Sequence, residues 1–408
     1  MGSHEWSRRD LLKSLGTGTL GLGVGAAVYR WLDHYIVGTR SADGAAAAAS
    51  VSDSGTSRID LTEHTSLKLV RGVFSRDRLE SLRSRDDVTF VHPDHTLRRV
   101  STSTSTSTRA DGTGQTLPWG VDRIDADIAH AEGTTGAGVD VGVIDHGIAN
   151  GHTDLAGNLA DPTDESNHES WVDCQECDQP WGDDLGHGTH VAGTIAAADG
   201  DDGVLGVAPD ATLHALKVCG GAGGCRASAI VEAIRYAADQ GWDVINLSLG
   251  SRRASPALQA AGQYALEAGV LPVAAAGNYG RPDSVSYPAA YDEFVAVTAT
   301  DIDDELTGFS STGPEVDIAA PGADICSTVV DGYAVQSGTS MAAPHVTGAT
   351  ATLLADGYTP TDARERLLET AEDLGMADTD QGAGLVDVAA AHGYESDGGT
   401  VERSRCPS

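Results

Sequence analysis

From residue 114 onward, short apolar runs alternate with segments of helical spacing. The apolar and β-branched runs that predict strands lie at 139–144, 213–218, 244–249, 270–275 and 294–299. Between the second and third runs, residues 229–240 carry apolar side chains at helical spacing, and Gly241 follows as a helix stop. Strands that alternate with helices predict an α/β domain with a mostly parallel central sheet, which we place at 114–393.

The pattern changes upstream of this domain. Residues 58–100 read as strand, helix and strand, with the helical segment at 76–85, and predict a small α+β unit. Residues 101–113 combine Ser-Thr repeats, Arg109 and a glycine-rich run, so we expect a polar linker of the kind that proteases cut. Residues 394–408 form a polar tail.

The chain begins with features of an export signal. Arg8 and Arg9 precede an apolar, glycine-rich stretch at 15–28, which is shorter than the ~20 residues needed to span a bilayer. A twin-arginine signal is therefore favoured over a retained membrane anchor. Small residues at 45–50 offer several cleavage sites, and we place the signal at 1–48 and a linker at 49–57. These features predict an extracellular protein with no stable membrane partner.

The charge balance is strongly acidic. The chain has 60 acidic and 26 basic residues, a net charge of -34, which argues against nucleic acid as a partner. An apolar content of 40% is normal for a folded protein, so disorder does not explain the charge. High salt would screen the self-repulsion, since the Debye length is about 3 Å at 1 M salt. We hypothesise a halophilic, salt-requiring protein; an ordinary acidic exported protein is the alternative.

Three short motifs carry the residue types of nucleophilic catalysis. Asp145 follows the first predicted strand, His187 lies within the string 186–194 (GHGTHVAGT), and Ser340 opens an apolar helix within 337–345 (SGTSMAAPH). Taken alone, each of these three residues is more simply interpreted as a helix cap or a loop residue. Together they supply a nucleophile, a base that accepts its proton and an acid that orients the base. Asn278, after the fourth strand, adds an amide donor for an oxyanion.

These motifs, in the order Asp, His, Ser and with Asn278 between the last two, resemble the signatures of subtilisin-like serine peptidases, the subtilases. The resemblance runs from about residue 115 to 391. Within the family, the chain resembles secreted haloarchaeal members. The resemblance implies a three-layer subtilisin-like fold and an endopeptidase of broad specificity that forms an acyl-enzyme at Ser340. It also implies a self-processing zymogen in which 58–100 is the inhibitory propeptide. The implied partners are protein and peptide substrates and the chain's own propeptide. We expect the protein to be a monomer.

The resemblance also implies how substrate binds. An extended peptide would pair as a β-strand between two segments of the enzyme. On one side these are the residues Gly220, Gly221, Ala222 and Gly223, up to Gly224; on the other side they are Ser248, Leu249 and Gly250. Ser286 stands at the base of the first specificity pocket, where the family often has glycine. We expect a slightly smaller or more polar pocket that takes medium or large apolar residues before the cut.

A structural calcium site is implied in the same way. The corresponding residues are Gln115, Asp154, Ala198, Asp202 and Val204. The usual side-chain ligand of the loop falls on Gly200, which is a departure from the family pattern, although aspartates surround it. Carboxylate oxygens are good Ca²⁺ ligands, but in so acidic a chain such a cluster can also be solvated surface.

Six cysteines are compatible with a few disulfides on an exported chain. Cys174 with Cys177, and Cys219 with Cys225, favour loop-stapling disulfides over zinc, because no second Cys or His pair has finger-like spacing. Cys326 and Cys406 either pair or stay free.

Two other readings remain. A lipase of the α/β-hydrolase class would need a G-x-S-x-G elbow and the order Ser, Asp, His, whereas Ser340 lies in GTSMA and comes last. A catalytically inactive subtilase-fold binding protein is the second alternative, and the absence of any broken motif position argues against it.

Overall fold

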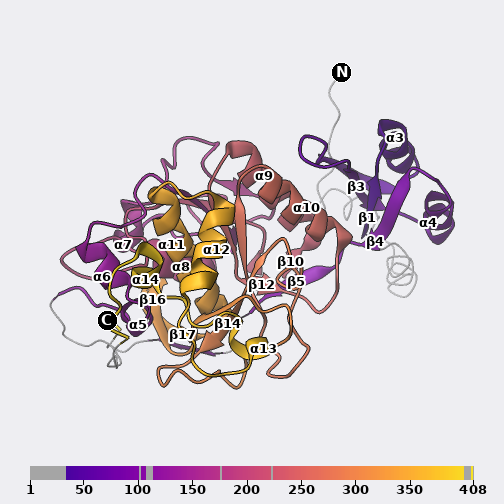
Figure 1. Ribbon diagram of the computed structural model, residues 1–408. Coiled ribbons are helices and arrows are strands. Elements are labelled where there is room, and N and C mark those ends of the chain that lie inside the picture. Colours follow the sequence, from indigo (N-terminus) through magenta and orange to yellow (C-terminus); the bar gives the residue numbers. More distant parts are fainter. Residues whose placement is uncertain are drawn as a thin grey trace, which may run out of the picture.

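The computed structural model describes residues 34–100, 103–106, 114–174, 177–221, 224–398 and 406–407. The predicted arginine pair and apolar stretch of the export signal lie outside the described residues. Figure 1 shows two bodies, a small domain near the N-terminus and a larger domain that holds the rest of the chain. Among the described helices, none is both long and apolar enough to cross a membrane.

The small domain is a four-stranded antiparallel sheet in the order β2-β3-β1-β4. Its strands are β1 (His34–Thr39), β2 (Ser54–Asp60), β3 (Lys68–Val73) and β4 (Val88–Pro93). Two helices, α3 (Ala42–Ser50) and α4 (Arg76–Arg83), place Ala45, Ala48, Leu79 and Leu82 in one core with Phe74. This is the α+β unit that the sequence predicts.

The predicted boundaries of this unit were wrong. The structure includes β1 and α3, so residues 34–57 belong to the small domain rather than to a signal and linker, and the domain begins at or before His34. The alanine-rich run at 45–49 reads as a cleavage site, but alanine is also the best helix former. Ser41 caps the helix by accepting a hydrogen bond from the Gly44 amide.

The large domain is built on a seven-stranded sheet in the order β15-β14-β13-β11-β7-β9-β8, and every neighbouring pair is parallel. The strands are β7 (Asp140–Asp145), β8 (Glu169–Ser170), β9 (Thr212–Lys217), β11 (Val244–Leu247), β13 (Leu271–Ala275), β14 (Val295–Thr300) and β15 (Ile318–Pro321). All five predicted strands are present, and the mostly parallel α/β prediction is confirmed.

Helices cover both faces of this sheet, as parallel sheets require. On one face α8 (His187–Ala196) and α11 (Thr339–Ala355) pack together, and on the other α9 (Ala227–Gln240) and α10 (Pro256–Glu267) do so (Figure 1). Strand β7 serves both cores, because Val143 joins the α8 and α11 side while Ile144 joins the other. Further helices complete the domain: α5 (Trp119–Arg123), α6 (Ala126–Ala131), α7 (Thr153–Ala156), α12 (Pro360–Thr370), α13 (Asp378–Gln381) and α14 (Val388–His392).

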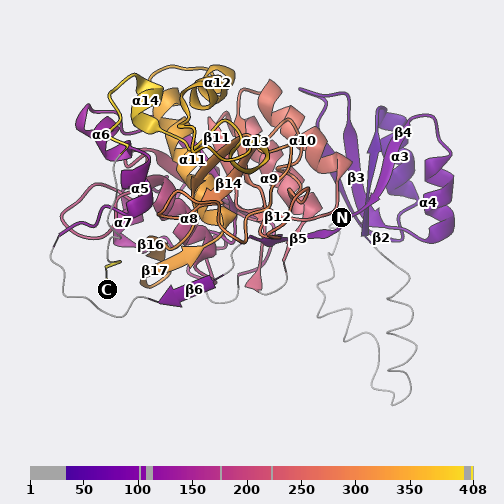
Figure 2. The ribbon, with the colours of Figure 1, turned by 60° about the horizontal axis from the view of Figure 1, so that its bottom comes forward.

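Two small antiparallel sheets connect upstream segments to the large domain. In the first, β5 (Thr96–Arg99) lies between β10 (Cys225–Arg226) and β12 (Leu249–Gly250). In the second, β6 (Ser103–Thr106) pairs with β17 (Gly332–Ser337), which pairs with β16 (Ile325–Val329). Figure 2 shows β5 reaching from the small domain into the large one, and β6 beside β17 beyond it.

A buried carboxylate joins the two domains. The side chain of Asp94 in the small domain is fully buried and accepts hydrogen bonds from the backbone N (3.0 Å) and Oγ (2.8 Å) of Ser228 in α9. Arg226 at the N-cap of α9 provides no side-chain cap of its own. Asp94 therefore caps a helix of the other domain, where a negative charge also favours the helix dipole.

All six cysteines form disulfides: Cys174–Cys177, Cys219–Cys225 and Cys326–Cys406. The two loop-stapling pairs match the prediction. The third pair, which the sequence left open, ties residue 406 of the polar tail to β16.

Candidate active site

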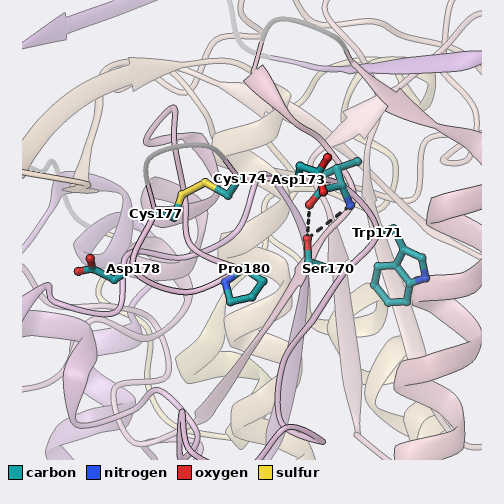
Figure 3. A pocket seen from close by; sticks show the side chains of 8 residues that line it. Ser170, Trp171, Asp173, Cys174, Cys177, Asp178 and Pro180 are labelled. Carbon is teal, nitrogen blue, oxygen red and sulfur yellow. Dashed lines mark hydrogen bonds between the residues drawn. A yellow bond between two sulfur atoms is a disulfide. The ribbon is translucent and has the colours of Figure 1, made fainter. Parts of the chain in front are cut away.

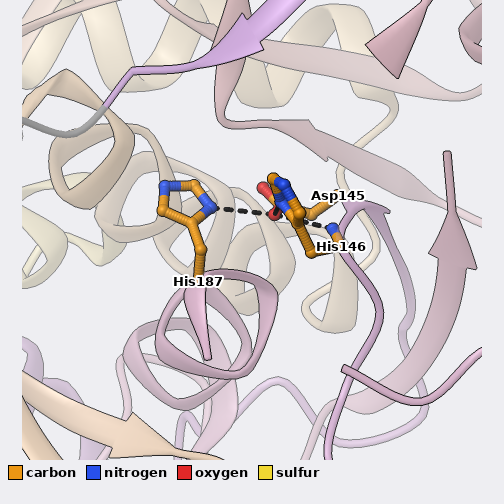
Figure 4. A group of neighbouring side chains, drawn as sticks. All are labelled: Asp145, His146 and His187. Atoms are coloured by element: carbon orange, nitrogen blue, oxygen red, sulfur yellow. Dashed lines mark hydrogen bonds and ion pairs between the residues drawn. The ribbon is translucent and has the colours of Figure 1, made fainter. Parts of the chain in front are cut away.

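Asp145 and His187 meet at the carboxyl edge of the central sheet. Asp145 is the last residue of β7, and His187 is the first residue of α8, which follows Gly186 in the left-handed region at φ +78°. Nδ1 of His187 donates to Oδ1 of Asp145 at 2.8 Å, and both side chains are buried (Figure 4). This contact fixes the tautomer of His187, with its Nε2 free to act as an acceptor.

A second histidine shares the same carboxylate oxygen. The backbone N and the ring Nδ1 of His146 donate to Oδ1 of Asp145 at 2.7 and 2.8 Å. The His146 and His187 rings lie edge to face, with their centres 5.7 Å apart (Figure 4). Burial works to raise the pKa of Asp145, but the neighbouring charge of His187 and the hydrogen bonds from His146 and His187 outweigh it, so the pKa lies far below its usual range. No role for His146 was predicted, although it directly follows Asp145.

Ser340 is the second residue of α11 and is fully buried. Its Oγ donates to the carbonyl O of Ser248 (2.9 Å) and accepts from the backbone N of Val100 (3.1 Å). Nε2 of His187 is buried and has no hydrogen-bond partner among the described residues. The serine hydroxyl is therefore turned toward the docked upstream segment, while the acceptor nitrogen of His187 remains available.

The carbonyl oxygen of Val100 is held by two donors. The backbone N of Ser340 donates to it at 3.2 Å and Nδ2 of Asn278 at 2.8 Å. Oδ1 of Asn278 accepts from both the backbone N and Oγ1 of Thr339 at 3.0 Å, which orients the amide so that Nδ2 faces Val100. The site thus presents two donors to one carbonyl oxygen, which is the arrangement of an oxyanion hole.

The segment before Val100 binds as a β-strand between two edges of the large domain. On one edge Leu249 pairs with Arg99 and Gly250 with Arg98, and the carbonyl of Ser248 accepts from the Val100 amide at 3.4 Å. Ser248, Leu249 and Gly250 are the three residues predicted for this edge.

The other edge lies further along the chain than predicted. Cys225 and Arg226 pair with Leu97 and Thr96, whereas Gly220 and Gly221 take no part in this pairing, and Ala222 and Gly223 lie outside the described residues. The Cys219–Cys225 disulfide closes the glycine-rich run into a loop, so that the paired edge begins where the loop ends. Gly224, at φ +73°, allows the close approach, because a Cβ there would lie 2.4 Å from Cγ2 of Thr96.

The side chain of Val100 packs beside Gly250, where the sequence predicts the first specificity pocket. A Cβ on Gly250 would lie 3.4 Å from Cγ2 of Val100 and 2.8 Å from Cβ of Ser286. Ser286 is buried, and its Oγ would be 2.2 Å from a Cβ on Gly277. Ser286 therefore lies against the same glycine as Val100 and fills space that a glycine at position 286 would leave open.

An insertion between β7 and α8 borders the site. It forms a surface pocket beside the Cys174–Cys177 disulfide (Figure 3), lined by Ser170, Trp171, Val172, Asp173, Cys174, Cys177, Asp178 and Pro180. Within it, Oγ of Ser170 donates to the carbonyl of Val172 at 2.6 Å. The Gly220 loop approaches this insertion, since a Cβ on Gly220 would lie 3.5 Å from Cβ of Val172.

Lys217 ties this insertion to the turn after Asp145. It is fully buried at the end of β9, in register with Asp145. Its Nζ donates to the carbonyls of His146 and Gly182 and to Oδ1 of Asp184. No role was predicted for Lys217. A lysine at the end of an apolar strand is the feature of the sequence that could have indicated a buried, structural side chain. The bonds of Lys217 hold the backbone of the residue that shares the Asp145 carboxylate.

The residues predicted to bind calcium gather beyond the C-terminal end of α8. Nε2 of Gln115 donates to the carbonyls of Ala198 (2.8 Å) and Val204 (3.3 Å). Oδ2 of Asp154 accepts from the Val204 amide at 2.9 Å, and Oδ1 of Asp202 accepts from the Gly114 amide at 3.3 Å. The amide of Gln115 thus points at two converging carbonyl oxygens, and a half-turn of this amide would place its own oxygen beside them.

Comparison with known proteins agrees with this geometry. Residues 136–385 match the Peptidase_S8 subtilase family. Subtilisin DY of Bacillus licheniformis is 44% identical over 285 residues, which cover 68% of this chain and 99% of that protein. Subtilisin E of Bacillus subtilis (strain 168) is 39% identical over 321 residues, 77% of each chain. An alkaline protease of Shouchella clausii is 41% identical over 311 residues, 76% of this chain and 77% of the relative.

Proposed function

Because the chain belongs to the subtilase family and is a serine endopeptidase, we propose that it is made as an exported zymogen that first cuts itself. The mature enzyme then hydrolyses proteins with broad specificity through the triad Asp145, His187 and Ser340. The observation that carries this proposal is the Val100 carbonyl, whose oxygen is held by the Ser340 amide and by Asn278. The first bond to be cut is then Val100–Ser101, which lies upstream of the linker residue Arg109.

In the first half of the proposed reaction, the hydroxyl of Ser340, which donates to the Ser248 carbonyl in this structure, turns to Nε2 of His187. Oγ of Ser340 attacks the carbonyl carbon of Val100 and passes its proton to Nε2 of His187. The carboxylate of Asp145, kept ionised by its hydrogen bonds, stabilises the imidazolium through Nδ1. Negative charge develops on the Val100 oxygen, where Asn278 already donates at 2.8 Å.

The second half releases both products. The C–N bond of Val100–Ser101 breaks, and His187 gives its proton to the new amine of Ser101. Water, deprotonated by His187, then attacks the acyl-enzyme, frees Ser340 and leaves a carboxylate on Val100. The small domain remains bound through the pairing of β5 and through the cap that Asp94 provides to α9. These contacts support its role as an inhibitory propeptide.

We propose that a calcium ion stabilises the large domain. The Gln115 side-chain oxygen, the carbonyls of Ala198 and Val204, and the carboxylate of Asp154 would hold it, a set of oxygen ligands that suits Ca²⁺. Asp202 lies beside this set. The ion would supply no step of the reaction; it would hold the loop 198–204 against the start of the domain.

The export route and the salt requirement complete the proposal. The arginine pair before a short apolar stretch supports twin-arginine export to the extracellular space. The net charge of -34 supports a halophilic enzyme whose self-repulsion is screened in concentrated salt. A zymogen suits this route, because twin-arginine export carries folded proteins and a folded protease needs an inhibitor before it leaves the cell.

Casein digestion by the wild type and by Ser340→Ala, in high and low salt, tests the function. We expect wild-type digestion, none by Ser340→Ala, and a mature N-terminus at Ser101 by mass spectrometry, while the Ser340→Ala chain stays intact. Casein that remains uncut by the wild type at every salt concentration would favour an inactive binding protein. A Ser340→Ala chain that is still trimmed without added protease would contradict self-processing.

A further inference from the structure

Two arginines enclose an exposed tyrosine next to the candidate active site. The guanidinium carbons of Arg252 and Arg281 lie 5.5 and 5.8 Å from the centre of the Tyr279 ring. Tyr279 is 42% exposed, which is unusual for so large an apolar ring, and both arginines are exposed. We call these three residues the arginine–tyrosine patch.

The patch stands out because its two arginines contact the Tyr279 ring but have no acidic partner among the described residues. Neither Arg252 nor Arg281 forms an ion pair with any acidic side chain that the structure describes, and Asp283, two residues after Arg281, does not reach it. Apart from the exposed Arg253, which adjoins Arg252, the other basic side chains of the large domain that the structure describes are used within the fold. Ion pairs hold Arg123, Lys217, Arg226, Arg235 and Arg364, and Arg366 donates to two carbonyls.

The position of the patch links it to the pocket that holds Val100. Tyr279 follows Asn278, whose amide donates to the Val100 carbonyl. Arg252 is two residues after Gly250, which lies against the Val100 side chain. The bridge between Ser251 and Tyr287 joins the Gly250 edge to the segment of Ser286 behind the pocket. Tyr279 and Arg252 thus lie one and two residues along the backbone from residues that contact Val100, and Arg281 joins them through its contact with the Tyr279 ring.

We propose that the arginine–tyrosine patch binds the carboxylate of a glutamate at the P1 position of a substrate, the residue whose carbonyl is attacked. This proposal rests on the proposed function and names its substrate preference. The glutamate methylenes would occupy the apolar part of the pocket, where Val100 lies, and the carboxylate would extend to Arg252 and Arg281. Guanidinium groups hold carboxylates through paired, charge-assisted hydrogen bonds.

The neighbouring substrate positions are less suitable for a carboxylate preference. The upstream segment places Arg99 at P2 and Arg98 at P3, paired with Leu249 and Gly250. A patch that selected acidic side chains at these positions would repel its own propeptide. Val100 at P1 carries no charge and leaves both guanidinium groups free for a substrate.

The net charge of the enzyme gives this preference a physical reason. With a net charge of -34 for the full chain, the protein repels acidic proteins wherever salt does not screen the charge. A local positive patch beside the pocket lowers this repulsion where the scissile bond must lie. Acidic proteins, which resemble this chain in composition, are therefore within its substrate range.

Peptides that differ only at P1 test the proposal. The series carries leucine at P4, as in the propeptide, alanine at P3 and P2, and Glu, Gln, Val or Lys at P1. With wild-type enzyme, at the lowest salt that keeps cleavage of the Val peptide at its full rate, we expect kcat/KM for Glu to exceed that for Gln by about 3- to 10-fold, the effect of two partly exposed ion pairs. The Lys peptide should be cut more slowly than the Gln peptide.

Charge-matched variants assign the effect to the patch. Arg252→Gln and Arg281→Gln should each lower the Glu-to-Gln ratio, and the double variant should bring it near one, while the Val-to-Gln ratio is unchanged. Arg235→Gln removes the same charge from α9 and should leave both ratios as in the wild type. A wild-type ratio at or below one, or a ratio that survives the double substitution, overturns the proposal. Failure to cut any peptide of the series would instead defeat the proposed function.

Discussion

Single atoms of Asp145 and Asn278 set the electrostatics of the site. Oδ1 of Asp145 accepts three hydrogen bonds, two of them from His146, while its buried Oδ2 has no partner among the described residues. Two hydrogen bonds from Thr339, neither of which involves the substrate oxygen, hold Asn278 in its orientation. The charge that develops on the substrate therefore meets donors that need no rearrangement.

Replacing Asn278 by leucine should lower kcat with little change in KM, because the lost donor acts on charge that develops only in the transition state. We expect a loss of about 10²- to 10³-fold, the magnitude known for the equivalent donor of a related subtilisin. Steady-state kinetics on a peptide p-nitroanilide would measure it. A loss confined to KM would mean that Asn278 only holds the ground state.

Three buried histidines should make the fold sensitive to acid. Burial lowers the pKa of His168 to about 4, of His190 to about 3 and of His345 to about 4 from an ordinary 6.5. Nδ1 of His168 accepts a hydrogen bond from the Ala215 amide, so protonation would break it. Because the folded pKa values are depressed, the unfolded chain binds protons first, and stability present above pH 6.5 is lost as the pH falls toward 4.

Urea unfolding of the Ser340→Ala chain between pH 4.5 and 7.5 measures this loss without self-digestion. Each such histidine contributes a slope of up to about 1.4 kcal/mol per pH unit. His168→Gln keeps an acceptor and a donor but does not titrate. It should lower the slope of the unfolding free energy against pH by up to about 1.4 kcal/mol per pH unit, the contribution of one proton. An unchanged slope in that variant would show that His168 does not control the acid response.

At the level of elements, the five central strands of the parallel sheet were the most predictable part of the fold. The five predicted strands have apolar runs that stay buried on both faces. By contrast, β8 has two residues and β15 ends at Pro321, so neither has a sequence signal. Asp145, His187, Ser340 and Asn278 could be predicted because each of them lies within a short sequence motif of its own. The contacts of His146, Lys217 and Val100 depend on tertiary packing, which a local pattern does not encode.

The cap that Asp94 provides to α9 should control how long the propeptide stays bound. Asp94→Ala removes the acceptor for Ser228 and one partner of Arg71, at a cost of about 1 to 2 kcal/mol. After self-cleavage, we expect activity to appear roughly tenfold sooner than in the wild type, as followed by continuous assay. Asp60→Ala is the matched control, because its ion pair with Lys68 lies within the small domain. Equal lag times in the two variants would contradict the role of the cap.

The loop 198–204 should depend on calcium. Chelator should lower the Tm of the mature enzyme, since an ion that binds only the folded state stabilises it by mass action. Asp154→Asn should have a lower Tm in calcium and should no longer respond to chelator. Asp161→Asn, on an exposed turn, is the control and should respond like the wild type. A Tm that chelator leaves unchanged would remove the proposed site.

The whole molecule carries far more negative charge than its ion pairs neutralise. We expect the Ser340→Ala chain to lose stability on dialysis from concentrated to dilute salt, because screening of its -34 net charge is lost. Thermal unfolding followed by circular dichroism across this range measures the effect. Chloride salts of sodium and potassium should act alike if screening is the cause. A Tm independent of salt would make this an ordinary acidic enzyme.

The disulfide between Cys326 and Cys406 encloses the part of the chain that contains Ser340. Cys406 packs with Ala197 and Val204 beside the loop 198–204, so the tail is fastened near the opposite end of α8 from His187. Protease molecules in solution can also cut one another. A single cut within this covalent ring leaves both new ends joined to the same molecule, so the nucleophile is not lost with a fragment.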